Sequence, residues 1–365
     1  MVGIVSNYLE VDFRDIESKQ SGDAITMRYS IDGVTYIHTV DGGFKSTGSS
    51  ICHHIREYYN DPEFLNHVVV THSDQDHAGG VQVIIDEFDV GTLWMLRPWN
   101  YADELIDRFQ RFSNVENLRK RLRELYPAIA TIEEIAIKKG INIEEPFQGK
   151  QIGAFTVVSP SKERFLDLIL ESDKTPEAVK EDEATLKGFL SNAFTEAVAT
   201  FKAALWGEEK FSPNETSAEN EMSVVQYCDF EGIKFLLTGD TGRAGLTEAA
   251  DYLENIGVPL PGIDRFQVPH HGSRRNVSSE TLDRLLGQKL TNSFESSENK
   301  FRAYISAAKE DKHHPRKSVI RAMIHRGANV FTTEGSSFRT GVNSPERIGW
   351  TSTIQPEPYP SENEE

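Results

Sequence analysis

The stretch VVVTHSDQDHAGGV, residues 68–81, places polar and charged side chains directly after an apolar run. The valines are typical of a strand that is buried on both faces, and the loop after such a strand often carries functional side chains. Two imidazoles and two carboxylates follow within six positions, at His72, Asp74, Asp76 and His77. Without a cation the carboxylates would repel each other and the imidazoles would become charged. The pattern therefore predicts a site for one or two divalent metal ions, and the alternative is an exposed polar loop.

The same pattern recurs twice downstream. FLLTGD is an apolar run that ends at Asp240, and FQVPHHGS is an apolar run that ends in His270 and His271. An isolated Gly-Asp pair carries no information, but three strand ends that each deliver Asp or His indicate a metal site.

Composition and charge limit the classes of protein to which the chain can belong. Its 365 residues are 38% hydrophobic and 10% aromatic, enough for one large or two ordinary globular domains. The formal net charge of −18 argues against non-specific binding to DNA or to anionic membranes. No signal peptide and no run of about 20 apolar residues is present, so we expect a cytoplasmic protein without a membrane partner. Cys52 and Cys228 lie outside any CxxC motif, and we expect both to be small core residues.

Strands and helices alternate over the first hundred residues. Two runs of alternating hydrophobicity flank an Asp-Gly turn and predict a hairpin. The predicted elements are strands at 24–31, 34–40, 67–71 and 90–96 and helices at 51–59 and 78–88. This order predicts sheets covered by helices.

The middle of the chain has a helical pattern. Apolar residues recur at helical spacing from Leu105 to Leu125, a further helix ends at Gly140, and a long amphipathic helix is expected from Leu186 to Leu205. A strand that stops at Pro160 separates these helices. We expect the helices to pack on the body as insertions, at about 101–148 and 163–210.

The last third returns to alternating elements. A hairpin is predicted from residues 222–230 and 233–240, with helices at 243–257, 278–287 and 314–327 and strands at 266–269, 302–308 and 328–334. The run 328–334 is predicted as the last strand. A single domain, residues 1–345, is therefore expected, followed by an acidic and disordered tail, residues 346–365.

At this point the sequence resembles a family. THSDQDHAGG, LLTGD and VPHHGS, in this order, resemble the metallo-β-lactamase-fold hydrolases, most closely the hydrolase domain of ComEC-type competence proteins. SGDAI, VDGG, VVSP, ENEMSVVQY and HHPRKSVIRAM with GANVFTTEG also resemble that branch. The resemblance covers about residues 8–100, 150–162 and 218–340 and leaves out the two insertions. It implies an α/β fold, an αββα sandwich with a metal centre at one edge.

The resemblance also implies a ligand set. His72 and Asp74 would hold one metal ion, and Asp76, His77 and one histidine of the pair His270 and His271 would hold the other. Asp240 would bridge the two ions. Asp41, at the end of YIHTVDGG, matches a strand-end Asp of the family and is expected to fix a ligand histidine. We favour His270 over His271 because it is nearer to the strand.

Two departures from the family pattern bear on the metal. Asp74 stands where the commonest motif has histidine, and no histidine lies between His77 and His270. The first metal position is therefore rich in oxygen, which suits harder ions. Mn²⁺ or Mg²⁺ is as plausible there as Zn²⁺, and a single-metal site stays open. Asn220 or Ser223 is a candidate for the vacant position.

Cationic groups near the motifs suggest the substrate. Arg274 and Arg275 follow HHGS directly, and His314 lies in a basic cluster and matches the branch's His-Pro position. Beside a metal site such groups favour a phosphate-bearing substrate, and the alternative is ordinary solvated charge. We therefore expect a phosphodiesterase or nuclease that acts on DNA, RNA or a nucleotide. A metal-activated water would be the nucleophile, with Asp76, Asp240 and His314 as catalytic residues.

Two other functions remain open. The chain could hydrolyse a lactone, a thioester or a β-lactam, although a lactamase would favour a secretion signal and a nitrogen-rich first site. It could also be a non-catalytic scaffold that binds a protein partner through its helical insertions. Retention of ligands at three strand ends argues against the scaffold.

Overall fold

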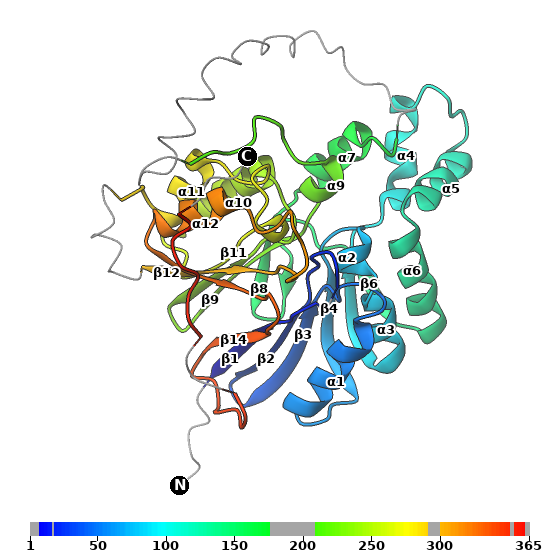
Figure 1. Ribbon diagram of the computed structural model, residues 1–365. Helices are drawn as coiled ribbons and strands as arrows, with labels where there is room; N and C mark the ends of the chain where they lie inside the picture. Colours follow the sequence, from blue (N-terminus) through cyan, green and yellow to red (C-terminus); the bar gives the residue numbers. More distant parts are fainter. Residues whose placement is uncertain (1–6, 17, 176–208, 291–299, 351–353, 362–365) are drawn as a thin grey trace, which may run out of the picture.

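Two seven-stranded sheets lie face to face, with helices on their outer faces (Figure 1). This computed structural model describes residues 7–16, 18–175, 209–290, 300–350 and 354–361. The expected helix from Leu186 to Leu205 lies outside the described residues. No helix in the described ranges is both long enough and apolar enough to cross a membrane.

The first sheet has the order β14-β1-β2-β3-β4-β5-β6. Its strands are β1 Tyr8–Phe13, β2 Ile25–Ile31, β3 Val34–Val40, β4 Phe64–Val70, β5 Asp89–Met95, β6 Asn142–Glu144 and β14 Phe338–Val342. Strands β14 to β3 pair antiparallel and β3 to β6 pair parallel. The predicted hairpin β2–β3 turns at Asp32 and Gly33, which both have positive φ, as a tight Asp-Gly hairpin turn requires.

The second sheet has the order β13-β12-β11-β10-β9-β8-β7. Its strands are β7 Gln151–Ile152, β8 Phe155–Ser159, β9 Val225–Phe230, β10 Ile233–Leu237, β11 Arg265–Gln267, β12 Phe301–Ile305 and β13 Ala328–Thr332. Strands β7 to β10 pair antiparallel and β10 to β13 pair parallel. Each sheet therefore has one parallel half, and the carboxyl ends of parallel strands share an edge.

The core lies between the sheets and beneath the helices. Across the interface, the ring of Phe13 from β1 stacks on Tyr304 from β12 with centroids 4.8 Å apart. Helices α1 Gly48–Tyr58, α3 Val81–Glu87 and α6 Pro127–Lys139 accompany the first sheet, and α10 Arg243–Asn255, α11 Ser279–Leu286 and α12 Lys317–Ile324 the second (Figure 1). Helix α10 buries one stripe at helical spacing, made of Leu246, Ala249, Ala250 and Leu253. Cys52 and Cys228 are buried and unpaired.

The helical run expected from Leu105 to Leu125 is interrupted. Helix α4 Ala102–Leu105 leads into a short 3₁₀ turn, and α5 spans Val115–Leu125. Asn114 starts α5, since its side chain accepts a hydrogen bond from the backbone of Asn117. Ser113 and Asn114 favour such a cap over a helix interior. The next helix, α6, ends as predicted at Gly140, which has a φ of 69°.

The carboxyl-terminal end of the chain differs from the expectation in two ways. Strand β13 is not the last strand, because β14 follows it and pairs with β1. The described residues of the expected disordered tail also contact the body. Arg347 forms ion pairs with Glu10 and Asp12, two residues of β1 that are completely buried. The backbone N–H of Glu357 donates to the carbonyl oxygen of Val330 in β13. Two fully buried carboxylates require cations, and the tail supplies one.

Candidate metal centre

Strand ends of both sheets meet at one edge and bring distant polar residues together. Asp41 follows β3 and His72 follows β4, while Asp240 follows β10 and His271 follows β11. All four strands belong to the parallel halves of the sheets. Their carboxyl ends therefore point the same way, and the loops after them form one site.

A single helical turn, α2 Gln75–Ala78, carries Asp76 and His77. Its backbone is locked to the loop after β3, because the N–H of Gly42 donates to the carbonyl of His77 at 2.9 Å. A Cβ atom at Gly80 would lie 1.8 Å from the carbonyl oxygen of Gly42. Only glycine permits this close approach, which explains the Gly-Gly pair after the motif.

Imidazole nitrogens and carboxylate oxygens converge around Asp240. His77 Nε2 lies 3.2 Å from Asp240 Oδ1, and His72 Nε2 lies 3.9 Å from Asp240 Oδ2. On the other side, His271 Nε2 is 3.4 Å from Asp76 Oδ2 and 3.9 Å from Asp240 Oδ2. Two groups with metal-ligand geometry result: His72, His77 and Asp240, and Asp76, His77 and His271.

The other ring nitrogen of each histidine is held by the protein. His77 Nδ1 lies 2.7 Å from Asp41 Oδ2, and His271 Nδ1 lies 2.9 Å from the carbonyl oxygen of Ser306. Both Nδ1 atoms therefore donate, which leaves the Nε2 lone pairs free for a cation. The Nε2 atoms of His72, His77 and His271 and Asp240 Oδ1 are buried and have no hydrogen-bond partner among the described residues. These residues fit a divalent cation.

The pKa values in this cluster are shifted by burial and by the charges that the residues bring together. Burial lowers the pKa of His271, but Asp240 and Asp76 outweigh it and raise that pKa to about 9. Burial also opposes the charge on His77, yet Asp240 and Asp41 hold its pKa well above the usual value. Burial would raise the pKa of Asp76, but the nearby imidazoles of His271 and His77 lower it. Two histidines thus balance the carboxylates with charge that a metal ion can supply instead.

Asp74 does not join the cluster. Its side chain is 39% exposed, its Oδ2 lies 3.9 Å from His72 Nε2, and its Oδ1 lies 3.3 Å from Lys174 Nζ. The resemblance paired His72 with Asp74, whereas the structure groups His72 with His77 and Asp240. Asp74 immediately precedes helix α2, and its side chain lies at the rim between His72 and Lys174.

The structure places His271, and not the favoured His270, in the groups with metal-ligand geometry, although His270 Nε2 also lies 3.7 Å from Asp240 Oδ2. Both residues have positive φ, 49° and 55°, so the backbone turns sharply after β11. The turn buries the ring of His271 in the cluster and leaves the side chain of His270 26% exposed. His270 Nδ1 lies 3.1 Å from Asn276 Oδ1 and 3.0 Å from Asn220 Nδ2. Asn220 therefore contacts His270.

Of the predicted substrate residues, His314 lies beside the site. The ring of His314 stacks on His270 with centroids 5.5 Å apart. Burial, together with His271 and His270, lowers the pKa of His314 to about 4. Arg274 is half-buried and Arg275 is exposed, and their side chains form no ion pair within the described part of the chain.

Sequence reasoning missed several contributors. Asp23 is buried beside Asp240 and His271 and forms a third group with metal-ligand geometry. Burial raises the pKa of Asp23 to about 6, although His77 and His271 oppose the shift. Thr71 donates its N–H and hydroxyl to Asp41 and so supports the position of His77. The signal for Asp23 was present in SGDAI, a short polar segment before a buried strand, but nothing local links that segment to the other ligands.

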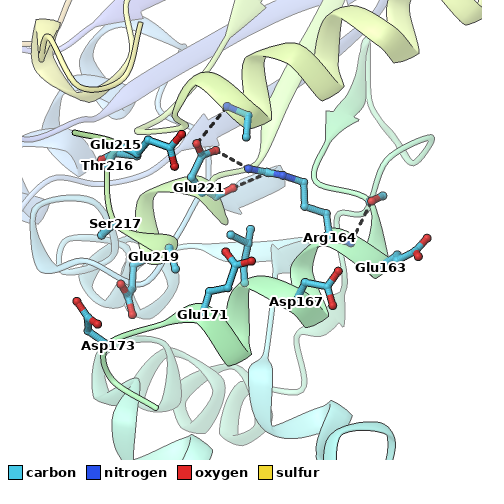
Figure 2. Close-up of a pocket in the computed structure, with 14 residues that line it drawn as sticks. Glu163, Arg164, Asp167, Glu171, Asp173, Glu215, Thr216, Ser217, Glu219 and Glu221 are labelled. Carbon is cyan, nitrogen blue, oxygen red and sulfur yellow. Dashed lines mark hydrogen bonds and ion pairs between the residues drawn. The ribbon is translucent and has the colours of Figure 1, made fainter. Parts of the chain in front are cut away.

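A separate cavity of about 620 Å³ lies between α7 Lys162–Glu171, α9 Ala218–Glu221 and the start of α10. Figure 2 shows acidic side chains around it, among them Glu163, Asp167, Glu171, Asp173, Glu215, Glu219 and Glu221. Among the described residues that line it, the cation Arg164 is paired with Glu221 at 2.5 Å. An acidic wall of this kind repels phosphate groups.

The comparisons with known proteins give a partial match. No protein-family model matches the chain. Over 119 residues, 32% of this chain, the sequence is 28% identical to ComE operon protein 3 of Bacillus subtilis (strain 168), and the match spans 13% of that protein. A Thermotoga maritima protein of the metallo-beta-lactamase type matches 68% of this chain and 92% of its own, at 10% identity and a TM-score of 0.31. A variant of CmlA beta-hydroxylase matches 91% of this chain and 53% of its own, at 11% identity and a TM-score of 0.37.

The two mixed sheets, the helices on their outer faces and the cluster at one edge confirm the predicted αββα sandwich. The residues with metal-ligand geometry follow strand ends of both sheets. The chain has the metallo-β-lactamase fold.

Proposed function

We propose that the protein is a metal-dependent hydrolase that cleaves phosphodiester bonds in DNA, RNA or a nucleotide. One observation carries the proposal. Three imidazole Nε2 atoms, from His72, His77 and His271, and Asp240 Oδ1 converge in a buried cluster without hydrogen-bond partners among the described residues. Such a cluster is costly to bury unless a cation binds it, and zinc, manganese or magnesium could serve.

A bound divalent ion would supply Lewis acidity and would lower the pKa of a coordinated water. The chain's own residues would orient the reactants. The pKa of Asp76 is lowered, so the carboxylate stays ionised and can accept a proton from an attacking water. Its side chain is 29% exposed, which leaves it accessible from the opening. His314 Nδ1 lies 3.3 Å from Asp311 Oδ2, and this contact orients the His314 ring toward the site.

The charges around the opening favour a phosphate over a neutral substrate. Lys174 pairs with Asp74 at the rim, and Arg274 and Arg275 follow HHGS directly in sequence, on a chain with a net charge of −18. They would bind phosphate oxygens, while a lactone or thioester offers no charge to match them. The acidic cavity around Arg164 would direct a polyanion away from itself and toward the metal centre.

Partner and location are also proposals. A nucleic acid or nucleotide follows from the phosphate argument, and a protein partner on the helical insertions is a further possibility. Two cysteines that stay unpaired are compatible with a reducing cytoplasm.

The experiment measures metal content by mass spectrometry and cleavage of bis-p-nitrophenyl phosphate, DNA and RNA with added Mn²⁺. We expect metal and phosphodiesterase activity in the wild type and loss of both in Asp76→Ala combined with Asp240→Ala. Asp167→Ala is the control, because Asp167 forms an exposed ion pair with Arg108 and belongs to the acidic cavity, not to the groups with metal-ligand geometry. A wild type that binds no metal and cleaves nothing would refute the enzyme hypothesis and favour the scaffold.

A second assay tests the substrate class. Replacing Arg274 and Arg275 by Glu should raise KM for a DNA substrate at least about tenfold, since two attractive charges become repulsive. The same variant should hydrolyse a neutral lactone or thioester as the wild type does. An unchanged KM for DNA would remove the two arginines from substrate binding.

A further inference from the structure

A carboxylate outside the three strand-end motifs lies in the metal centre. Asp23 belongs to the turn before β2, and 2% of the residue is exposed. One oxygen of Asp23, one oxygen of Asp240 and one ring nitrogen of His271 all lie within 4.8 Å of one another. Asp23 is thus placed like a ligand, although it lies far from the other acidic ligands in sequence.

A hydrogen bond from Gln267 fixes the orientation of the Asp23 side chain. Gln267 Nε2 donates to Asp23 Oδ2 at 3.0 Å. The amide of Gln267 cannot turn over, because its Oε1 already accepts from the backbone N–H groups of Thr238 at 2.8 Å and Gly239 at 3.2 Å. Asp23 Oδ1 is left buried and has no hydrogen-bond partner in the described ranges. An orphaned carboxylate oxygen is costly, and a cation would offset that cost.

The backbone of Asp23 is hydrogen-bonded to the segments that carry Asp76 and Gly43. Its N–H donates to the carbonyl of Asp76 at 3.0 Å, and its carbonyl accepts from Gly43 at 2.7 Å. At Gly22 a Cβ atom would lie 2.7 Å from the carbonyl oxygen of Asp76. The position of Asp23 therefore depends on the same loop that presents Asp76, and it is preorganised for the site.

We propose that Asp23 is a metal ligand, through Oδ1, to the ion that His271 and Asp240 also hold. This position then offers three carboxylates, from Asp23, Asp76 and Asp240, against the imidazoles of His77 and His271. Oxygen-rich donor sets suit Mn²⁺ and Mg²⁺, whereas nitrogen-rich sets favour Zn²⁺. Asp23 therefore sets a preference of the site for the harder ions. The inference rests on the proposed metal-dependent function.

The test compares Mn²⁺ and Zn²⁺ affinities of the metal-free protein by calorimetry. In Asp23→Asn the amide oxygen would turn toward Gln267, and the NH₂ group would face the metal position. We expect Mn²⁺ affinity to fall at least about tenfold, since even residues behind the ligands cost 10–100-fold in other metal sites. Zn²⁺ affinity should fall less, so the ratio of the two affinities changes. Asp264→Asn is the control, because Asp264 accepts a backbone hydrogen bond at the start of β11, away from the site.

A merely structural carboxylate would affect both metals equally or not at all, and either result would overturn the inference. Asp23→Ser is measured in parallel in case Asp23→Asn does not fold, and near-ultraviolet circular dichroism checks both variants. If the wild type binds metal and cleaves phosphodiesters while both variants keep the wild-type affinity ratio, the inference fails and the proposed function stands. If the wild type binds no metal, both fail.

Discussion

Two adjacent histidines on one turn have different environments. His271 Nε2 lies near both Asp76 and Asp240. His270 Nε2 lies 3.7 Å from Asp240 Oδ2, but its ring is partly exposed, contacts Asn276 and stacks on His314. We therefore expect His271→Ala to lose tightly bound metal and His270→Ala to retain it with weaker substrate binding. Mass spectrometry of desalted protein measures the metal, and KM measures the substrate. Metal loss in His270→Ala with retention in His271→Ala would contradict the assignment.

The candidate residues at three strand ends could be predicted from sequence, because Asp and His directly after apolar runs are visible locally. The choice between His270 and His271 could not, because it depends on two consecutive residues with positive φ. Asp23 was missed for another reason. Its role depends on a hydrogen bond from Gln267 on the opposite sheet, and no sequence spacing reveals that contact.

At the scale of single elements, strand β1 depends on the segment after β14. Glu10 and Asp12 are fully buried, and Arg347 pairs with both. We expect Arg347→Ala to lower the free energy of unfolding by about 3 kcal/mol, because buried Asp12 loses its arginine, while Glu10 keeps Arg28 and Arg339. Chemical denaturation measures the change.

The matched control is Arg108→Ala, which removes an exposed ion pair with Asp167. That change should cost at most about 1 kcal/mol. Equal effects in the two variants would show that the buried network contributes no more than a surface pair.

Glu209 contacts His325 and Arg326 just after helix α12, and this contact stabilises the protein to a degree that depends on pH. Burial would raise the pKa of Glu209, but hydrogen bonds from His325 and Arg326 lower it from its usual 4.5 to about 2. A depressed carboxyl pKa stabilises the fold above the unfolded value, and this stability is lost as the pH falls from about 4.5 to about 2. We expect Glu209→Gln to destabilise the protein by about 3 kcal/mol at pH 7 and by much less at pH 2.5. Urea titrations at both pH values measure this difference, and a difference that does not depend on pH would exclude the ionised carboxylate as its source.

The long elements could be predicted because their hydrophobic periods extend over many residues. Strands β6 and β7 were missed, since three and two residues show no period. Strand β14 was missed because its sequence FRTGV holds an arginine and a glycine. Its partner β1 lies at the other end of the chain, so its pairing has no local signal.

For the whole molecule, a metal ion would connect the two sheets. His72, Asp76 and His77 follow β4 of the first sheet, and Asp240 and His271 follow strands of the second. An ion that binds only the folded state raises the free energy of unfolding by about 2.7 kcal/mol when its free concentration is 100 times its Kd. We expect Mn²⁺ to raise the Tm by several degrees over that in chelator. Differential scanning calorimetry tests this, with Asp76→Ala combined with Asp240→Ala as the control that should show no shift.

The pairing of β14 with β1 has a consequence for synthesis of the chain. Figure 1 shows the last strand beside the first, and the register joins Leu9 to Val342. A ribosome adds about 5–20 residues per second, so the outer edge of β1 waits on the order of tens of seconds for its partner. An unpaired edge is a template for pairing with another chain. The nascent protein is therefore most vulnerable to aggregation before its last strand emerges, and its need for a chaperone should be greatest then.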